Sequence, residues 1–101
     1  MPLSSYLKEK RQKKAISQKE VADQIGRIRH QFISNIERGA SKPPVDILKK
    51  MCAIYEIEEE EMKTQFVIDS VAMARQEAEE KWNQAFAPKE ASRSAESWLM
   101  L

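Results

Sequence analysis

One short stretch of the chain carries polar side chains at a helical spacing. Residues three and four positions apart share a helix face, so Gln31, Ser34 and Asn35 are expected to point outward while two isoleucines point inward. His30 lies at the flank of this face, near its N-terminal end. Glutamine and asparagine amides can pair with N6 and N7 of adenine. The stretch therefore has the chemistry to read bases, although an outward polar face can also be merely solvated.

Charge is distributed unevenly along the chain. Residues 1–57 hold 12 Lys and Arg against 6 Asp and Glu, a net charge of +6. Residues 58–101 hold 5 against 10, a net charge of −5. A basic first part joined to an acidic second part indicates a surface for a polyanion, attached to a segment that does not contact it. A charge-rich solvated surface is the alternative, so the asymmetry alone favours nucleic acid only modestly.

Other kinds of chemistry find little support in the residues. A metal site needs a cluster of ligands, but His30 is the only histidine and Cys52 the only cysteine. Cys52 is expected to be a buried apolar residue, and the glutamates at 58–61 to form a solvated first turn of a helix. The sequence shows no phosphate-binding loop, nucleotide fingerprint or catalytic triad. We therefore expect no enzyme, no cofactor and no metal.

The expected location follows from what the chain lacks. No apolar run approaches the roughly 20 residues that span a bilayer, and the N-terminal residues lack the apolar stretch of a signal peptide. A single cysteine cannot form an internal disulfide. We expect a cytoplasmic protein with no membrane segment.

The chain predicts an all-α fold, because it has only 2 glycines and 4 prolines and no strand-like alternation. Ser4 or Ser5 is expected to cap a first helix that runs to about Lys14. Ser17, followed three residues later by Glu20, predicts a capping box for a second helix over residues 18–25. Two helices are thus expected before residue 26.

Glycine and proline mark the boundaries of the next helices. Gly26 is expected to stop the second helix in a left-handed conformation, and Gly39 to stop a third helix over residues 30–38. Pro44 is expected in the first turn of a fourth helix that runs to Tyr55. The residues that this helix is expected to bury are Val45, Leu48, Met51 and Cys52.

The second and third predicted helices, joined by a glycine turn, are typical of a helix-turn-helix. The runs ISQKEVADQIG and FISNIERGASKPPVDILKKMCAIYEI resemble the phage Cro and repressor family of helix-turn-helix domains, the XRE family. The resemblance covers residues 3 to about 62. It implies a lambda-repressor-like five-helix domain whose third helix enters the major groove of DNA.

The resemblance also implies roles for individual residues. Counting back from Gly39, the base-reading positions of the family match His30, Gln31, Ser34 and Asn35. Gln18 resembles the family residue that contacts phosphate at a helix N-terminus, and nearby cations are expected to neutralise other phosphates. The expected phosphate contacts are Arg11, Gln18, Arg27, Arg29, Arg38 and Lys42.

The turn between the two helices departs from the family pattern. Gly26 and Gly39 lie one position further apart than is usual in the family, and the additional residue falls within residues 26–29. Arg29 occupies the helix-cap position that members of the family often fill with serine or threonine. The departure bears on the angle of the third helix and on where its reading face begins.

The last part of the chain predicts a helical interface. Residues 58–86 would form a helix of about 43 Å at 1.5 Å per residue. Small and apolar residues recur along it at a near-heptad spacing, and an apolar C-terminus is expected to be buried at an interface as well. The expected interface residues are Val67, Val71, Ala74, Ala78, Trp82, Ala85, Trp98 and Leu99.

The sequence therefore predicts a helix-turn-helix DNA-binding domain over residues 1–62 and a helical dimerisation or partner-binding extension over residues 63–101. A homodimer is favoured, because operators of this kind are usually two-fold. The alternatives are a different protein docked on the extension, as with an antitoxin or adaptor, and a helix folded back on its own domain. The expected function is that of a sequence-specific transcriptional regulator, a repressor, on double-stranded DNA.

Overall fold

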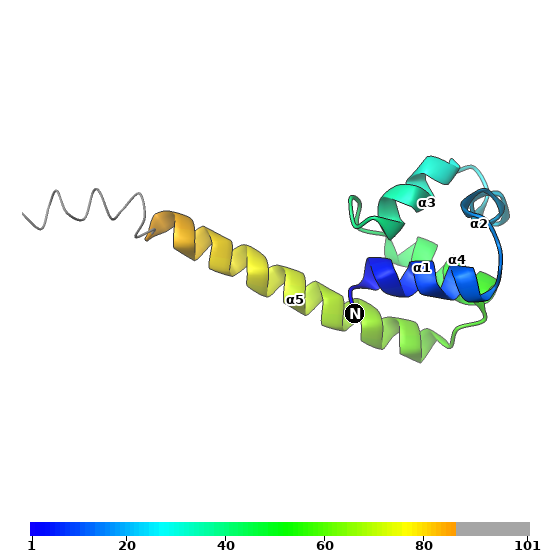
Figure 1. Ribbon diagram of the computed structural model, residues 1–101. Helices are drawn as coiled ribbons and strands as arrows, with labels where there is room; N and C mark the ends of the chain where they lie inside the picture. Colours follow the sequence, from blue (N-terminus) through cyan, green and yellow to red (C-terminus); the bar gives the residue numbers. More distant parts are fainter. Residues whose placement is uncertain (87–101) are drawn as a thin grey trace, which may run out of the picture. The chain divides into compact units, whose positions relative to one another are not determined.

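The chain forms five helices and no strand within the residues that the structure describes. The structure is a computed structural model and describes residues 1–86. Its helices are α1 (Leu3–Lys13), α2 (Gln18–Ile25), α3 (His30–Glu37), α4 (Val45–Tyr55) and α5 (Glu59–Ala85), in the order drawn in Figure 1. The predicted all-α fold with five helices is confirmed.

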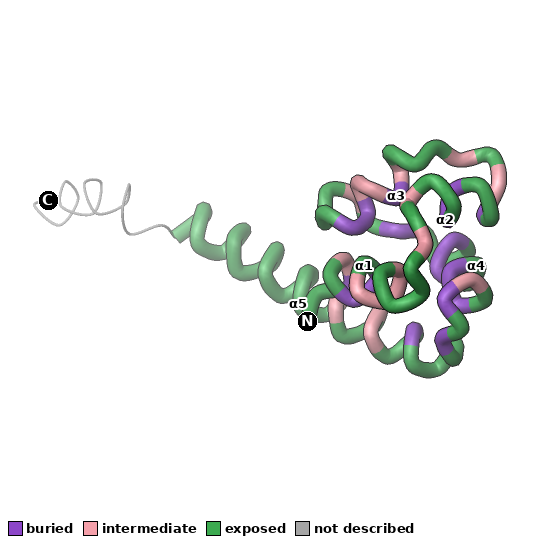
Figure 2. The backbone as a smooth tube through the Cα atoms, turned by 45° about the vertical axis from the view of Figure 1, so that its right-hand side comes forward, coloured by how far each residue is buried: buried purple, intermediate pink, exposed green. Residues whose placement is uncertain are grey.

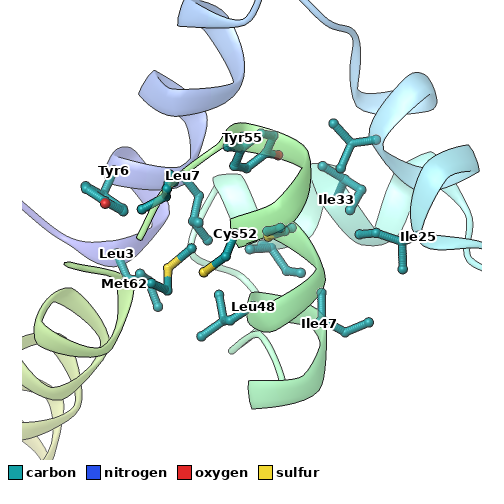
Figure 3. Close-up of a cluster of buried hydrophobic side chains, with 14 of the residues drawn as sticks. Leu3, Tyr6, Leu7, Ile25, Ile33, Ile47, Leu48, Cys52, Tyr55 and Met62 are labelled. Atoms are coloured by element: carbon teal, nitrogen blue, oxygen red, sulfur yellow. The ribbon is translucent and has the colours of Figure 1, made fainter. Parts of the chain in front are cut away.

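Residues Met1–Asp69 form a compact unit around one apolar core. In this unit α2 packs against α3 and α4, and α1 packs against α3. The burial colours of Figure 2 place most buried residues on α1–α4, and Figure 3 shows part of the core that they form. The largest fully buried side chains are Leu7, Val21, Ile33, Ile36 and Met51. The α2–α3 pair is therefore packed against α1 and α4.

The predicted capping box at the start of α2 is present. The Ser17 hydroxyl accepts a hydrogen bond from the Glu20 backbone N–H at 3.0 Å, and the Ser17 N–H donates to the Glu20 carboxylate at 3.1 Å. Two backbone N–H groups that the helix itself leaves unpaired are thus satisfied. The start of α2 is fixed by its own sequence.

The predicted start of α1 was wrong. Neither Ser4 nor Ser5 caps the helix, which has Pro2 at its N-cap and begins at Leu3. The Leu3 side chain is buried, and its N–H donates to a carboxylate oxygen of Asp69 at 3.1 Å. The first backbone N–H of α1 therefore finds its acceptor on a residue 66 positions away, which no local sequence pattern could indicate.

Helix α4 also differs from its prediction at the N-terminal end. Pro44 is the N-cap rather than a first-turn residue, and the predicted core residue Val45 is 64% exposed. Val45 shares a face with Leu48 and Cys52, but it lies in the first turn, at the rim of an apolar groove that also includes Phe66. Burial of this face therefore begins one turn later, while the other predicted core residues of α4 are buried as expected.

Ala15, between α1 and α2, has a left-handed backbone with φ of 55° and is exposed. A Cβ makes this conformation unfavourable by about 1 kcal/mol, and glycine adopts it freely. We expect Ala15→Gly to raise the free energy of unfolding by about 0.5–1 kcal/mol in urea denaturation. Ala53→Gly, an exposed position inside α4, is the matched control and should lower it by about 1 kcal/mol. A loss of stability in both variants would contradict the strain assigned to Ala15.

Helix α5 covers almost the whole range predicted for the fifth helix, and the second unit of the chain begins within it, at Ser70. All residues from Val71 to Phe86 are exposed. The predicted interface residues Trp98 and Leu99 lie outside the described residues. None of the helices described in residues 1–86 combines the length and the apolar character that a membrane span needs.

Candidate nucleic-acid interface

The turn between α2 and α3, which is one residue longer than the family pattern described above, still contacts the apolar core. Gly26 ends α2 with φ of 90°, and its N–H donates to the Ala22 carbonyl at 2.9 Å. Its positive φ was predicted, but its ψ of 138° is not left-handed helical, and Arg27 adopts that conformation instead, with φ of 57°. Ile28 packs against the core. The two neighbouring arginines, Arg27 and Arg29, are left exposed.

Helix α3 separates an apolar face from a polar one. Ile33 and Ile36 have no exposed surface, as their spacing predicted. The polar face brings the four predicted base-reading residues together, with His30 and Gln31 exposed and Ser34 and Asn35 partly exposed. Arg29 is the N-cap of this helix and makes no side-chain capping bond.

The polar face of α3 carries a chain of side-chain hydrogen bonds. The Gln31 amide nitrogen donates to the Asn35 side-chain oxygen at 3.1 Å. The Arg38 guanidinium donates to the same oxygen. The three residues, one turn apart along the helix, thus form a single connected group.

The structure gives Arg11 a role other than the predicted phosphate contact. Its Nε and Nη2 donate to the two carboxylate oxygens of Glu37 at 2.7 and 3.1 Å, and its Nη1 donates to the Ile16 carbonyl at 2.9 Å. The Arg11 side chain is only 13% exposed and that of Glu37 only 2%. These hydrogen bonds with Glu37 raise the pKa of the Arg11 guanidinium. Arg11 ties α1 to the end of α3 and is withdrawn from the surface, so it is left out of the phosphate contacts proposed below.

Gln18 joins the same buried carboxylate. Its amide nitrogen donates to a Glu37 oxygen at 3.1 Å, which uses one of its two amide hydrogens. The side chain is partly exposed at the start of α2. Gln18 is thereby held next to the N-terminal backbone of α2, where unpaired N–H groups can face an anion.

Sequence reasoning missed Glu37, although a signal was present. Glu37 follows Ile33 and Ile36 at four and one positions, so helical periodicity places it on the inward face of α3. A carboxylate on an inward face needs a cationic partner. The prediction of Arg11 as a surface residue left that partner unidentified.

Three predicted phosphate contacts keep their charged groups at the surface. Arg27, Arg29 and Lys42 are exposed, and no ion pair within residues 1–86 engages them. The Lys42 ammonium lies 5.6 Å from the centre of the Phe66 ring, a cation–π distance that leaves the cation accessible. These groups have the charge and exposure that contact with a polyanion requires.

Metal binding and cysteine chemistry find no support in the described residues. Within residues 1–86 no three His, Cys, Asp or Glu side chains gather in a way that could hold a metal ion. Burial raises the pKa of the Cys52 thiol, which disfavours the thiolate that nucleophilic chemistry needs. The exposed cations and the polar face of α3 remain the candidate interface.

Comparison with known proteins identified one relationship. A family model described as helix-turn-helix matches residues 7–62, which is more than half of the chain and includes all of α2, α3 and α4. No curated protein and no solved structure matched the chain.

Proposed function

The chain belongs to the XRE family of helix-turn-helix domains, which are DNA-binding transcriptional regulators of the Cro and repressor type, and from this premise we propose that it is a repressor that binds a two-fold operator as a homodimer. The polar face of α3 carries the proposal, because four side chains able to bond base edges lie together above two fully buried isoleucines. Occupation of DNA that polymerase needs would produce repression.

In the proposed complex, α3 lies in the major groove and its polar face reads bases. His30, Gln31, Ser34 and Asn35 supply amide, hydroxyl and imidazole groups for this purpose. The buried partners of α3 support this role, since Ile33, Ile36 and the Arg11–Glu37 pair fix the helix against the domain. A rigidly held helix can place its side chains on base edges reproducibly.

Phosphate contacts in the proposed complex come from around α3. The contributing residues are Gln18, Arg27, Arg29, Arg38 and Lys42. Arg27 and Arg29 extend this set into the turn, and Arg27 keeps a left-handed backbone that a non-glycine residue adopts at a cost of about 1 kcal/mol.

The proposed dimer forms through the predicted seam of α5. Val67, Val71 and Trp82 are 47%, 61% and 64% exposed, and the Trp82 and Phe86 rings lie 4.2 Å apart between centroids. Ala74, Ala78 and Ala85 of the seam are also exposed. Apolar residues exposed at this spacing are typical of helix–helix interfaces, and small residues along a helix let a partner helix approach closely. We assign the DNA-binding domain to residues 1–62 and the interface to 63–101.

The rival function is that of an antitoxin-like or adaptor protein whose α5 binds a different protein. The same exposed seam supports this function, because an apolar helix face can pack into a groove on a different protein just as it can pack against a second copy of this chain. The two functions differ in what dimer disruption does to DNA binding.

A matched pair of alanine substitutions in α5 tests the proposal. Ala74 belongs to the seam, whereas Ala72, also exposed, lies two residues away and therefore on nearly the opposite face of the helix. Ala74→Glu places two carboxylates in the dimer interface, so we expect the monomer–dimer Kd to rise by at least about 100-fold in sedimentation equilibrium. Ala72→Glu adds the same charge to the same helix and should leave the Kd unchanged.

DNA affinity of the same variants separates the two functions. If the protein reads a two-fold site as a dimer, the Ala74→Glu variant should bind DNA more weakly than the wild-type chain, and the Ala72→Glu variant should bind it with unchanged affinity. A monomeric wild-type protein, with equal DNA affinity in both variants, would refute the homodimer and leave the rival.

A further inference from the structure

Asn35 lies at the centre of the hydrogen-bonded chain on the polar face of α3, and its side-chain oxygen is fully engaged. That oxygen accepts from the Gln31 amide at 3.1 Å and from the Arg38 guanidinium. A carbonyl oxygen has two lone pairs, so both are used within the helix. A bond to a charged guanidinium is also stronger than a neutral one. The amide is thus held in one of its two orientations.

We propose that Gln31 and Arg38 hold Asn35 as a donor-only group, so that Asn35 selects guanine rather than adenine at the base that it faces. The inference rests on the proposed function, since it requires that α3 read bases. It makes Asn35 the specificity-determining residue, and it gives Gln31 and Arg38 a positioning role in addition to the base and phosphate contacts proposed for them above.

The base edges in the major groove differ in what they offer to such a group. Guanine presents two acceptors, N7 and O6, to which the two hydrogens of the Asn35 nitrogen can both donate. Adenine presents one acceptor, N7, beside an N6 amino group that needs an acceptor in return. With its oxygen occupied, Asn35 leaves that amino group unpaired, and a buried unpaired donor is unfavourable. The usual asparagine–adenine pairing is therefore blocked here.

The backbone at Asn35 is held in place as well. The Asn35 carbonyl accepts from the N–H groups of Ala40 and Ser41 at 2.8 and 3.2 Å, which closes the C-terminal end of α3. Arg38 is the C-cap of this helix. Arg38 follows Asn35 by three residues and lies further from the helix N-terminus that enters the groove, so Arg38 is the less suited of the two to read a base and is better placed to orient Asn35.

Selection from a random duplex library, carried out with the full chain, tests the inference. The Asn35→Ala variant first identifies the base pair that Asn35 reads, because the base preference at that position of the selected DNA should be lost. We expect guanine at that position for the wild-type chain. In Arg38→Met one lone pair of Asn35 is freed, so the ratio of guanine to adenine there should fall about tenfold or more.

Arg27→Met is the matched control, because it removes the same guanidinium from an exposed position in the turn. It should weaken binding to all sequences alike and leave the guanine-to-adenine ratio unchanged. Adenine preference in the wild-type chain, or an unchanged ratio in Arg38→Met, would overturn the inference while the proposed function stands. Enrichment of no sequence at all would overturn both.

Discussion

Replacing Glu37 by alanine is expected to lower the free energy of unfolding of the compact unit Met1–Asp69 by about 3–5 kcal/mol. Glu37 is 7% exposed and accepts hydrogen bonds from Arg11 and Gln18. Without it the Arg11 guanidinium stays buried with no opposite charge, and desolvation of that charge is no longer offset. Since a small domain has a total stability of only about 5–10 kcal/mol, this loss is a large part of it. Urea denaturation followed by circular dichroism measures the loss.

Two variants show whether burial is the cause. Glu9→Ala removes a partly exposed carboxylate whose pair with Lys13, at 3.5 Å, follows the helical i,i+4 spacing, and should cost less than about 0.5 kcal/mol. The double variant Arg11→Met/Glu37→Met removes both charges and fills similar volume, so it should recover most of the stability lost in Glu37→Ala. A loss below about 1 kcal/mol for Glu37→Ala would mean that water reaches Arg11 and screens it.

Local periodicity and capping predicted most of the fold, because these features depend on residues close together in the chain. The capping box of Ser17 and Glu20 and the inward face of Ile33 and Ile36 are set by contacts within a turn or two of helix. Features that depend on distant partners were not predictable in this way. The Leu3 N–H donates to the side chain of Asp69, which is 66 positions away. Val45 is exposed because it lies in the first turn of α4, where burial of its helix face has not yet begun.

In the candidate site, too, features set by local spacing were predictable and features set by distant contacts were not. The polar face of α3 follows from spacing, so its residues could be predicted from the sequence alone. The charged residues could not be sorted by sequence, because a surface arginine and a buried one have the same side chain. Arg11 and Arg27 were both predicted to contact phosphate, yet one is paired with Glu37 and the other is exposed. Only tertiary contact separates them.

The affinity of the dimer for DNA is expected to fall by about 10³–10⁴-fold between 50 and 200 mM salt. Arg27, Arg29 and Lys42 supply three exposed cations per protomer, and Arg38 can supply a fourth, which gives six to eight phosphate contacts in a dimer. Each neutralised phosphate releases counterions, so the logarithm of affinity should fall with the logarithm of salt with a slope of about −5 to −7. Fluorescence anisotropy of a labelled duplex of random sequence measures this slope without knowledge of the operator.

Single charge removals show which cations account for the salt dependence. Arg27→Ala should make the slope shallower by about two, one phosphate for each protomer of the dimer. Lys81→Ala removes an exposed cation from α5, in the segment assigned to the interface, and should leave the slope unchanged. The dimer-breaking Ala74→Glu should roughly halve the slope, because a monomer has half of the contacts. A shallow slope in the wild-type chain would contradict the proposed surface, and an equal effect of Arg27→Ala and Lys81→Ala would show that overall charge, rather than the turn, governs binding.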